Sequence, residues 1–216
     1  MKPSERIKRY IFLFVSLWIM AFGIAFSIKA DLGTSPISSF PYVLSLITPL
    51  TVGTVTILMH CVFIALQILI LRRQYQLVQL MQLPVALVFG VITDFALWVI
   101  RDFTYTAYWQ QWALCLIGIA LVGLGVRCEV TARVVTLAGE GLILAIVKVS
   151  SISFSTMKIV FDVTLVALAC ICSFAFLHGL YGVREGTLAA ALLVGTVAKW
   201  LQPILRRFEH RWLGEI

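Results

Sequence analysis

The chain has 216 residues, of which 61% are hydrophobic and 12% are charged, and its formal net charge is +7. A soluble domain has about a quarter of its residues charged, so this composition excludes an ordinary soluble fold and predicts a protein whose main solvent, and main partner, is the lipid bilayer. The net positive charge would suit nucleic acid, but the basic residues are gathered in four short clusters. These clusters are residues 2–9, 72–73, 127–133 and 206–211. Such clusters are typical of loops at one membrane face, so we expect no nucleic-acid partner.

Six apolar stretches approach or exceed the roughly 20 residues that cross a hydrocarbon core. They cover residues 10–28, 53–71, 84–100, 112–126, 156–177 and 186–201, the last extending to residue 205 past Pro203. The first stretch follows a basic leader as a signal peptide does, but its apolar core is too long and Ile28-Lys29-Ala30 is a poor cleavage site. We therefore expect a retained first helix and six spans.

The order of the spans fixes the orientation. With six spans, the four basic clusters share one side with both termini, and Lys29, Arg101 and Arg184 remain for the other side. Positive charge favours the cytoplasmic face. The sequence therefore predicts a multi-pass protein with cytoplasmic N- and C-termini.

The segment "KADLGTSPISSFPYVLSLITPLT", residues 29–51, interrupts this pattern with three of the six prolines. Residues 36–50 are too few to span the bilayer, and Ser35 with Pro36 makes a good helix start. A half-spanning helix beginning there would point free backbone N–H groups into the membrane. The candidate substrate-binding residues of this segment are Gly33, Thr34, Ser35, Ser38 and Ser39. The alternative is an interfacial helix that is capped only for stability.

An internal repeat appears when the chain is shifted by about 102 residues. The first and second spans then fall on the fourth and fifth, the third falls on the sixth after a slip of three residues, and the broken segment falls on residues 133–149, "RVVTLAGEGLILAIVKV". Three spans in each half place the halves in opposite orientations, as in transporters built from inverted repeats. We predict one membrane domain over residues 1–216, with repeats at about 10–100 and 111–203. An eight-span alternative would move residues 72–73 to the outer side, against the charge rule.

A stripe of small residues occurs in both repeats. The third span contains Ala86, Gly90 and Asp94 at four-residue spacing, and the sixth contains Ala191, Gly195 and Lys199 at the same spacing. Four-residue spacing places each set on one helix face, where small residues allow close helix packing. We expect Asp94 to face a transport pathway and Lys199 to reach the interface.

The second broken segment carries Glu140 between Gly139 and Gly141. A carboxylate in so apolar a context is costly unless it is paired, hydrated or protonated. In the repeat Glu140 falls on Ser38, so we expect the two to face each other as parts of one binding site. Glu140 is the candidate proton carrier, cation ligand or partner of a substrate amine. The alternative places it at the cytoplasmic interface.

Three further polar residues lie inside spans. Lys158 and Asp162 are four residues apart and are expected to pair along one helix face, for structure or for gating. His60 falls on Asp162 in the repeat and is either hydrogen-bonded core or part of the pathway. With Glu140 and Asp94, these three make up the candidate pathway charges.

The chain resembles the YczE/YyaS/YitT-type integral membrane proteins of bacteria. The resemblance rests on "DLGTSPISSFPYVLS" after the first span and "GVREGTLAAALLVGTVAKWLQP" around the sixth, and it covers nearly the whole chain. It implies a protein of the bacterial inner membrane and gives no substrate.

The residues therefore predict an all-α polytopic membrane protein with six transmembrane helices, two half-spanning helices and a 3+3 inverted repeat. The function predicted first is small-molecule transport, with proton coupling through Glu140. The alternatives are a substrate-binding subunit or channel without its own coupling, and a scaffold or regulator. Zinc-protease, nucleophile-elbow and phosphate-loop motifs are missing from the sequence, so we expect no enzyme, no metal and no cofactor. A homo-oligomer is compatible with the sequence.

Overall fold

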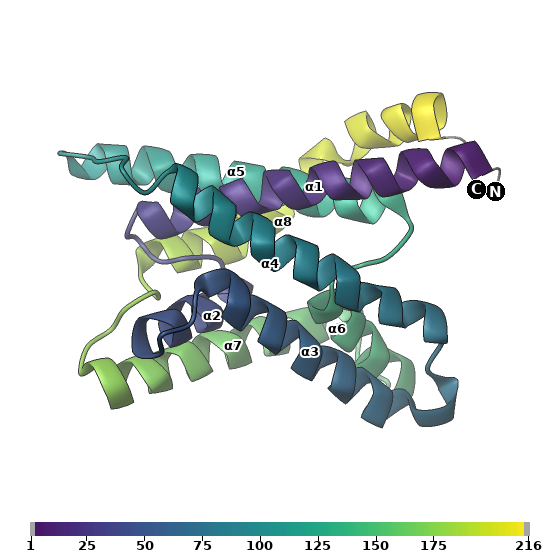
Figure 1. Cartoon of the computed structure of the whole chain (residues 1–216), viewed down its shortest axis with the longest axis horizontal. Helices are drawn as coiled ribbons and strands as arrows, with labels where there is room; N and C mark the ends of the chain where they lie inside the picture. Colours follow the sequence, from purple (N-terminus) through teal and green to yellow (C-terminus); the bar gives the residue numbers. More distant parts are fainter. Residues whose placement is uncertain (1–2, 214–216) are drawn as a thin grey trace.

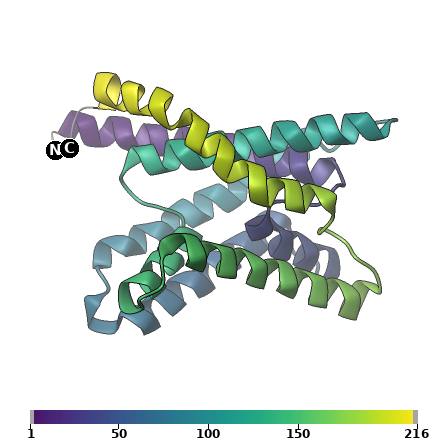
Figure 2. The ribbon, with the colours of Figure 1, turned by 180° about the vertical axis from the view of Figure 1, so that it is seen from behind.

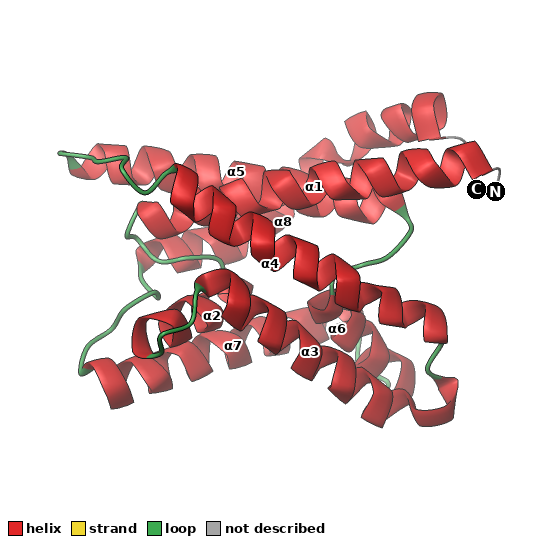
Figure 3. Ribbon diagram, in the orientation of Figure 1, coloured by secondary structure: helices red, strands yellow, loops and turns green. Residues whose placement is uncertain are grey.

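The computed structural model describes residues 3–213, and within that range the chain is helical with no strand (Figure 3). Eight α-helices follow one another along the chain. They are α1 (Pro3–Lys29), α2 (Pro36–Ile47), α3 (Val52–Leu71), α4 (Gln82–Val99), α5 (Tyr108–Ala132), α6 (Ala138–Val149), α7 (Phe154–Leu177) and α8 (Glu185–Phe208). Short helical turns at Arg72–Gln74 and Leu77–Met81 join α3 to α4, and a turn at Glu209–Leu213 follows α8.

Six of these helices are long and apolar enough to cross a membrane, and they correspond to the six predicted spans. The remaining two, α2 and α6, have 12 residues each and cannot cross it. The chain is thus an all-α, multi-pass membrane protein with two short helices, as predicted. Helices α1 and α5 are longer than the predicted spans, because charged and polar residues at their ends continue the helices.

The two short helices begin in the middle of the molecule. After α1 and after α5 the chain turns back as a short linker, and α2 and α6 start at its inner end and run outward (Figure 1). Burial follows this course, because Ser38 is 7% exposed near the start of α2 and Leu46 is 43% exposed near its end. Pro36 is the first residue of α2, as expected, but Ser35 makes no capping bond to the backbone. The hydroxyl of Ser35 donates instead to Ser38, at 3.0 Å.

The two halves follow the same plan at an offset of 102 residues. Helix α2 runs from 36 to 47 and α6 from 138 to 149. Their N-cap residues Ser35 and Leu137 have nearly the same backbone angles, φ −60°, ψ 151° and φ −59°, ψ 151°. Asp31 and Arg133, at the turn after α1 and α5, both have positive φ, 54° and 51°. In Figure 1, α1 and α5 run in opposite directions, as do α3 and α7, and α4 and α8. These matches support the predicted inverted repeat, while its limits at residues 10–100 and 111–203 remain a prediction.

The helices form two bundles, seen as two layers in Figures 1 and 2. Bundle A consists of α1, α4, α5 and α8, and bundle B consists of α2, α3, α6 and α7. Each bundle has its own apolar core, around Met20, Phe89 and Val122 in bundle A and around Phe63 and Phe161 in bundle B.

Small residues allow the central helices of bundle A to touch. A side chain added to Gly23 of α1 would lie 2.7 Å from the backbone nitrogen of Val122 in α5. One added to Gly125 of α5 would lie 2.9 Å from the backbone nitrogen of Met20. Backbone contact of this kind is how membrane helices associate without a hydrophobic driving force between them.

The two predicted small-residue stripes differ in the structure. Gly90 of α4 packs against Gly53 and Ile57 of α3, so the prediction of close packing is confirmed in the first half. In the second half that prediction is wrong, because a side chain added to Gly195 of α8 would meet no atom within 4 Å. Helix α8 lies across α5 and stands away from α7, to which only a loop joins it (Figure 2).

Candidate binding cavity

A cavity of about 80 Å³ lies between the two bundles, and seven of the eight helices line it. Its wall is mostly apolar. The polar residues that line it are Ser35, Ser38, Thr56, His60, Glu129, Glu140 and Lys158. This volume holds several water molecules or a small solute. A mostly apolar wall with a few convergent polar groups is the usual composition of a small-molecule site.

The first turns of α2 and α6 meet at this cavity. A side chain added to Gly139 of α6 would lie 2.7 Å from the Cδ1 atom of Ile37 in α2. These two residues are repeat equivalents, so they touch where the two halves meet. Ser38 of α2 and Glu140 of α6, which the sequence predicted to face one site, both line the cavity. The N-terminal ends of two helix dipoles, each equivalent to about half a positive charge, therefore converge here.

Two carboxylates lie at the α6 end of the cavity. Glu129 of α5 is 2% exposed, and its Oε1 accepts a hydrogen bond of 2.6 Å from the backbone N–H of Leu137, the N-cap residue of α6. Glu140 follows in the first turn of α6. The two side chains are close enough to interact electrostatically. Both are placed where the positive end of the α6 dipole stabilises negative charge.

Lys158 and Asp162 of α7 form the predicted ion pair, with Nζ 2.7 Å from Oδ1. Lys158 also lines the cavity, whereas Asp162 does not. Both charges act electrostatically on Glu140. Lys158 is therefore shared between a structural pair and the cavity, and its positive charge is largely matched by Asp162.

His60 of α3 lines the cavity and is 1% exposed. Its ring packs edge-on against Phe63 and Phe89, and its Nδ1 atom has no hydrogen-bond partner within residues 3–213. A buried polar atom without a partner is costly and indicates a missing ligand or water. In the same part of the chain, no three histidine, cysteine or acidic side chains lie together as a metal site would require.

Several predicted binding residues lie outside the cavity wall. Gly33 and Thr34 belong to the linker between α1 and α2, and they pack against the start of α8. The hydroxyl of Ser39 donates to the carbonyl oxygen of Pro36 at 2.7 Å. Gly139 is needed for contact with Ile37, as described above. These residues shape the linker and the first turn of each short helix, and the structure gives them no contact with the cavity.

Gly141 and Asp94 also lie away from the cavity. Gly141 packs against the amide groups of Gln67 and Gln82. Asp94, predicted to face a pathway, instead binds the first turn of α3, where it accepts hydrogen bonds from the backbone N–H of Gly53 at 2.7 Å and from Thr51 at 2.6 Å. Its visible role is that of a helix cap.

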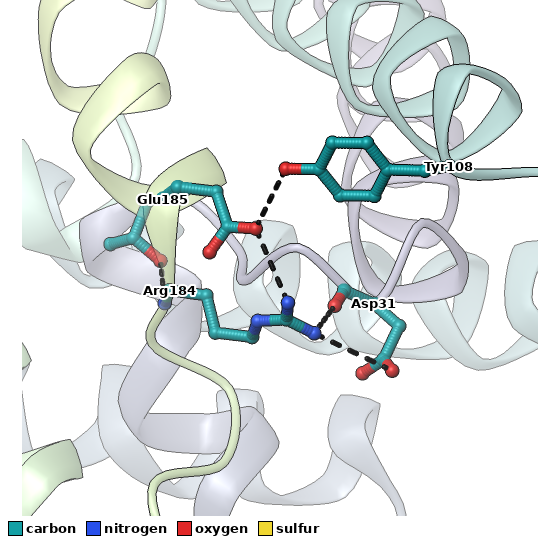
Figure 4. Close-up of polar contacts among 5 residues, drawn as sticks. Asp31, Tyr108, Arg184 and Glu185 are labelled. Carbon is teal, nitrogen blue, oxygen red and sulfur yellow. Dashed lines mark hydrogen bonds and ion pairs between the residues drawn. The ribbon is translucent and has the colours of Figure 1, made fainter.

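We call the end of the molecule that carries both termini the terminal face, and the opposite end the far face (Figure 1). At the far face a group of contacts, here called the latch, closes the linker after α1 against the start of α8. Arg184 donates to the carbonyl oxygen of Asp31 at 2.8 Å and to the carboxylate of Glu185 at 3.2 Å, and Tyr108 of α5 also donates to Glu185 (Figure 4). The backbone adds a bond from Gly186 to the carbonyl oxygen of Leu32, 2.7 Å long.

At the terminal face the corresponding linker, between α5 and α6, borders a second pocket of about 330 Å³. Its wall includes Gln82, Arg133, Gly141 and Lys148. Glu129 lines both this pocket and the central cavity. Glu129 therefore stands between the central cavity and the terminal face.

Sequence reasoning missed Glu129. The apolar pattern predicts that the fourth span ends at residue 126, which leaves the polar residues after it at the membrane interface. The helix continues to Ala132, which carries Glu129 inside the protein. The available signal was the sequence "GVRCEVTAR", in which a lone carboxylate follows an apolar span without a break, four residues before the next linker.

Residues 7–203 match the model of a family of unknown function, DUF6198. The chain belongs to this family. It is also 27% identical over 201 residues to the uncharacterized protein YyaS of Bacillus subtilis strain 168, covering 92% of this chain and 94% of that protein. The resemblance to YyaS-type membrane proteins is thereby confirmed. No solved structure matches the chain significantly.

Proposed function

We propose that this protein is a small-molecule transporter whose substrate site is the cavity between the two bundles. One observation carries the proposal. The first turns of two half-spanning helices, one from each half of the chain, meet at a single buried cavity. Secondary transporters with inverted repeats place their substrate sites in this way, at helix ends near the middle of the membrane.

The residues of the cavity support transport over a purely structural role. Charged side chains inside a membrane protein are costly and usually mark a substrate or ion pathway. A scaffold does not need Glu129 and Glu140 buried at the same cavity as His60, whose Nδ1 has no hydrogen-bond partner within the described residues. The two sides of the cavity also differ, as they do in a transporter. At the far face the latch closes the linker after α1, whereas at the terminal face a pocket reaches Glu129.

We propose further that the protein lies in the bacterial inner membrane with its terminal face in the cytoplasm. Figure 1 places the two termini and the connection between α3 and α4 at the same end, so the predicted basic clusters share that end. Arg9 and Arg133 both lie beside Glu209, which ties the start of α1 to the end of α5 and to the C-terminal segment. This distribution follows the positive-inside rule.

Proton-coupled uptake or export tests this function. Purified protein is reconstituted into proteoliposomes loaded with a pH-sensitive dye, and amines, carboxylates, amino acids and sugars are added in turn. We expect at least one class of solute to move protons in the wild type, and Glu140→Gln to abolish that movement. The control variant is Asp102→Asn, because Asp102 is exposed and its ion pair within the described residues is with the neighbouring Arg101.

Two results would contradict the proposal. If no solute moves protons or enters the vesicles, the protein does not transport these classes and a scaffold is favoured. If a solute enters passively and its entry is unaffected by an uncoupler or by Glu140→Gln, the protein is a channel without its own coupling. Transport with unchanged rate in Glu140→Gln would also remove the proposed role of this residue.

A further inference from the structure

The charge balance of the cavity is negative. Lys158 is paired with Asp162, which leaves Glu129 and Glu140 as the carboxylates of the cavity wall without a cation of their own. Within residues 3–213, Glu129 accepts one backbone hydrogen bond and Glu140 makes no hydrogen bond or ion pair. Two helix dipoles supply about one positive charge in total. The wall therefore keeps about one unmatched negative charge.

Among the described residues, no charged side chain other than Glu129, Glu140 and Lys158 lines the cavity. The residues of α1, α2 and α4 that line the cavity carry no titratable group, and α3 contributes only His60. Arg133 and Lys148 line the terminal-face pocket instead. Arg133 is bound to Glu209 at 3.0 Å, and Lys148 lies in the exposed last turn of α6. An uncompensated carboxylate in this setting needs a proton or a cation.

The remaining polar groups of the cavity are those that an ammonium group would use. A primary ammonium has three N–H donors and no acceptor. The cavity offers it the two carboxylates, the hydroxyls of Ser35 and Ser38, and the ring of His60, whose buried Nδ1 has no partner within the described residues. A carboxylate or phosphate ligand would instead face Glu129 and Glu140 directly.

The size and walls of the cavity limit the rest of such a ligand. Its volume of about 80 Å³ admits a short chain of a few non-hydrogen atoms. Met20, Ile24, Met59 and Val122 provide apolar surface for an alkyl group, and Phe89 presents an aromatic ring. Cations are attracted to aromatic faces. A bare metal ion is disfavoured, because no three histidine, cysteine or acidic side chains cluster in the described part of the chain.

We infer that the cavity binds a small organic cation, a protonated primary amine, in exchange for one proton held by the Glu129–Glu140 pair. The inference rests on the proposed transport function and specifies its substrate class. Because cation and proton satisfy the same unmatched charge, they compete for it. Since Glu129 also lines the terminal-face pocket, it connects the exchange to that face of the protein.

Binding to purified protein tests the inference without requiring transport. Methylammonium, ethylammonium and propylammonium are titrated calorimetrically between pH 6 and 9, in two buffers of different ionisation enthalpy that contain no primary amine. We expect a member of this panel to bind, with affinity rising by up to about tenfold per pH unit while one proton is displaced. Ethanol and acetate, which match ethylammonium in size, should not bind.

Isosteric variants identify the groups involved. Glu129→Gln and Glu140→Gln should each weaken binding by about tenfold or more and remove the proton release, since each loses a charged partner. Gln keeps a carbonyl oxygen that can accept the bond from Leu137, so Glu129→Gln is expected to fold. Size-exclusion profiles check this, and Asp102→Asn serves as the matched control with unchanged affinity.

The outcomes separate the inference from the proposed function. If none of the cations binds, if acetate binds in their place, or if binding releases no proton, the inference is overturned. Cation binding with proton release but no flux into proteoliposomes would retain the cation site and remove the transporter. Proton-coupled flux of a neutral or anionic solute would retain the transporter and overturn the cation site.

Discussion

The two sides of the cavity are closed very differently, although the two halves of the chain follow one plan. On one side α4 crosses α3 so closely that a side chain added to Gly90 would lie 2.7 Å from the carbonyl oxygen of Gly53. On the other side α8 stands away from α7, and Gly195, the repeat counterpart of Gly90, faces open space. The apolar stretch of α8 is 6% buried, against 44% for that of α4. Within the described residues, long helices of bundles A and B therefore cross in close contact on the α3–α4 side, whereas on the other side α8 contacts the short helix α2 and stands away from α7.

Charge explains much of this difference. Asp94 of α4 lies at the first turn of α3, where a carboxylate satisfies free N–H groups and suits the helix dipole. Its repeat counterpart in α8 is Lys199. A cation brought to the first turn of α7 in the same way would be repelled by that dipole. The two halves thus share a backbone plan, and a few side chains determine whether each side is closed or open. Any relative motion of the bundles would pivot about the α3–α4 crossing.

The helix crossing gives the largest expected effect. A side chain at Gly53 would overlap the carbonyl oxygen of Gly90 and the carboxylate of Asp94. Because a backbone must shift, Gly53→Ala should destabilise the protein by about 3 kcal/mol and reduce the yield of monodisperse protein. Gly195→Ala is the matched control, and it should be neutral or stabilising by up to about 1 kcal/mol. Thermal unfolding of detergent-purified variants, followed by size exclusion, measures both. Equal losses in the two variants would remove the contrast between the two sides.

The two linkers provide a second contrast. Gly33 has φ of 90°, and a side chain there would lie 2.6 Å from the backbone nitrogen of Arg184. We expect Gly33→Ala to cost about 2–3 kcal/mol, from the strained backbone and the overlap together. The repeat-equivalent residue in the other linker is Val135, which is 8% exposed. Val135→Ala should cost about 1–2 kcal/mol, because it removes buried methyl groups without strain.

The same thermal assay ranks these two variants. A smaller loss in Gly33→Ala than in Val135→Ala would show that the linker after α1 tolerates a side chain. The close fit against the start of α8 would then be unnecessary for folding.

The latch should control access to the cavity from the far face. Arg184→Gln removes the contacts to Asp31 and Glu185. These groups are partly exposed, so we expect their loss to shift the protein modestly toward a state that is open at the far face. The measurement is the labelling of Ser38→Cys by a membrane-impermeant thiol reagent, which should become about threefold to tenfold faster. The background has its five native cysteines replaced. Arg101→Gln is the control, because Arg101 also lies at the far face, and its side chain pairs with the exposed Asp102 and lies over the ring of Trp98, away from the latch. An unchanged rate in Arg184→Gln would show that the latch does not limit access.

Much of the fold could be predicted from the sequence because the bilayer imposes simple rules. Length and apolarity mark the spans, and short, proline-containing segments such as that starting at Pro36 cannot cross. The order of elements in the two halves indicated the repeat. The meeting of Ser38 and Glu140 at one cavity followed from that repeat, since equivalent positions lie around a common pseudo-twofold axis.

The rest depended on contacts between distant segments, which the sequence does not display. Asp94 looked like a pathway charge because its partners at the start of α3 are more than 40 residues away. Glu129 looked interfacial because its depth depends on how far α5 continues. The sequence does not reveal that the face of α8 at Gly195 is open, because the same spacing of small residues occurs on the tightly packed face of α4 at Gly90. A spacing defines a face, and the neighbouring helix decides whether that face is covered.

The smallest expected effect concerns the charges that distinguish the two sides. Asp94→Asn keeps a hydrogen-bond acceptor at the first turn of α3 but loses the negative charge, so we expect a cost of about 0.5–1 kcal/mol. Lys199→Gln should change stability by less than about 0.5 kcal/mol, because Lys199 is exposed. The charge-reversal variant Asp94→Lys should cost more than Asp94→Asn, since a cation then faces the positive end of the helix dipole that we hold responsible for the open side. If Asp94→Lys unfolds no more easily than Asp94→Asn, charge does not explain the asymmetry, and the shape of α8 against α5 must do so.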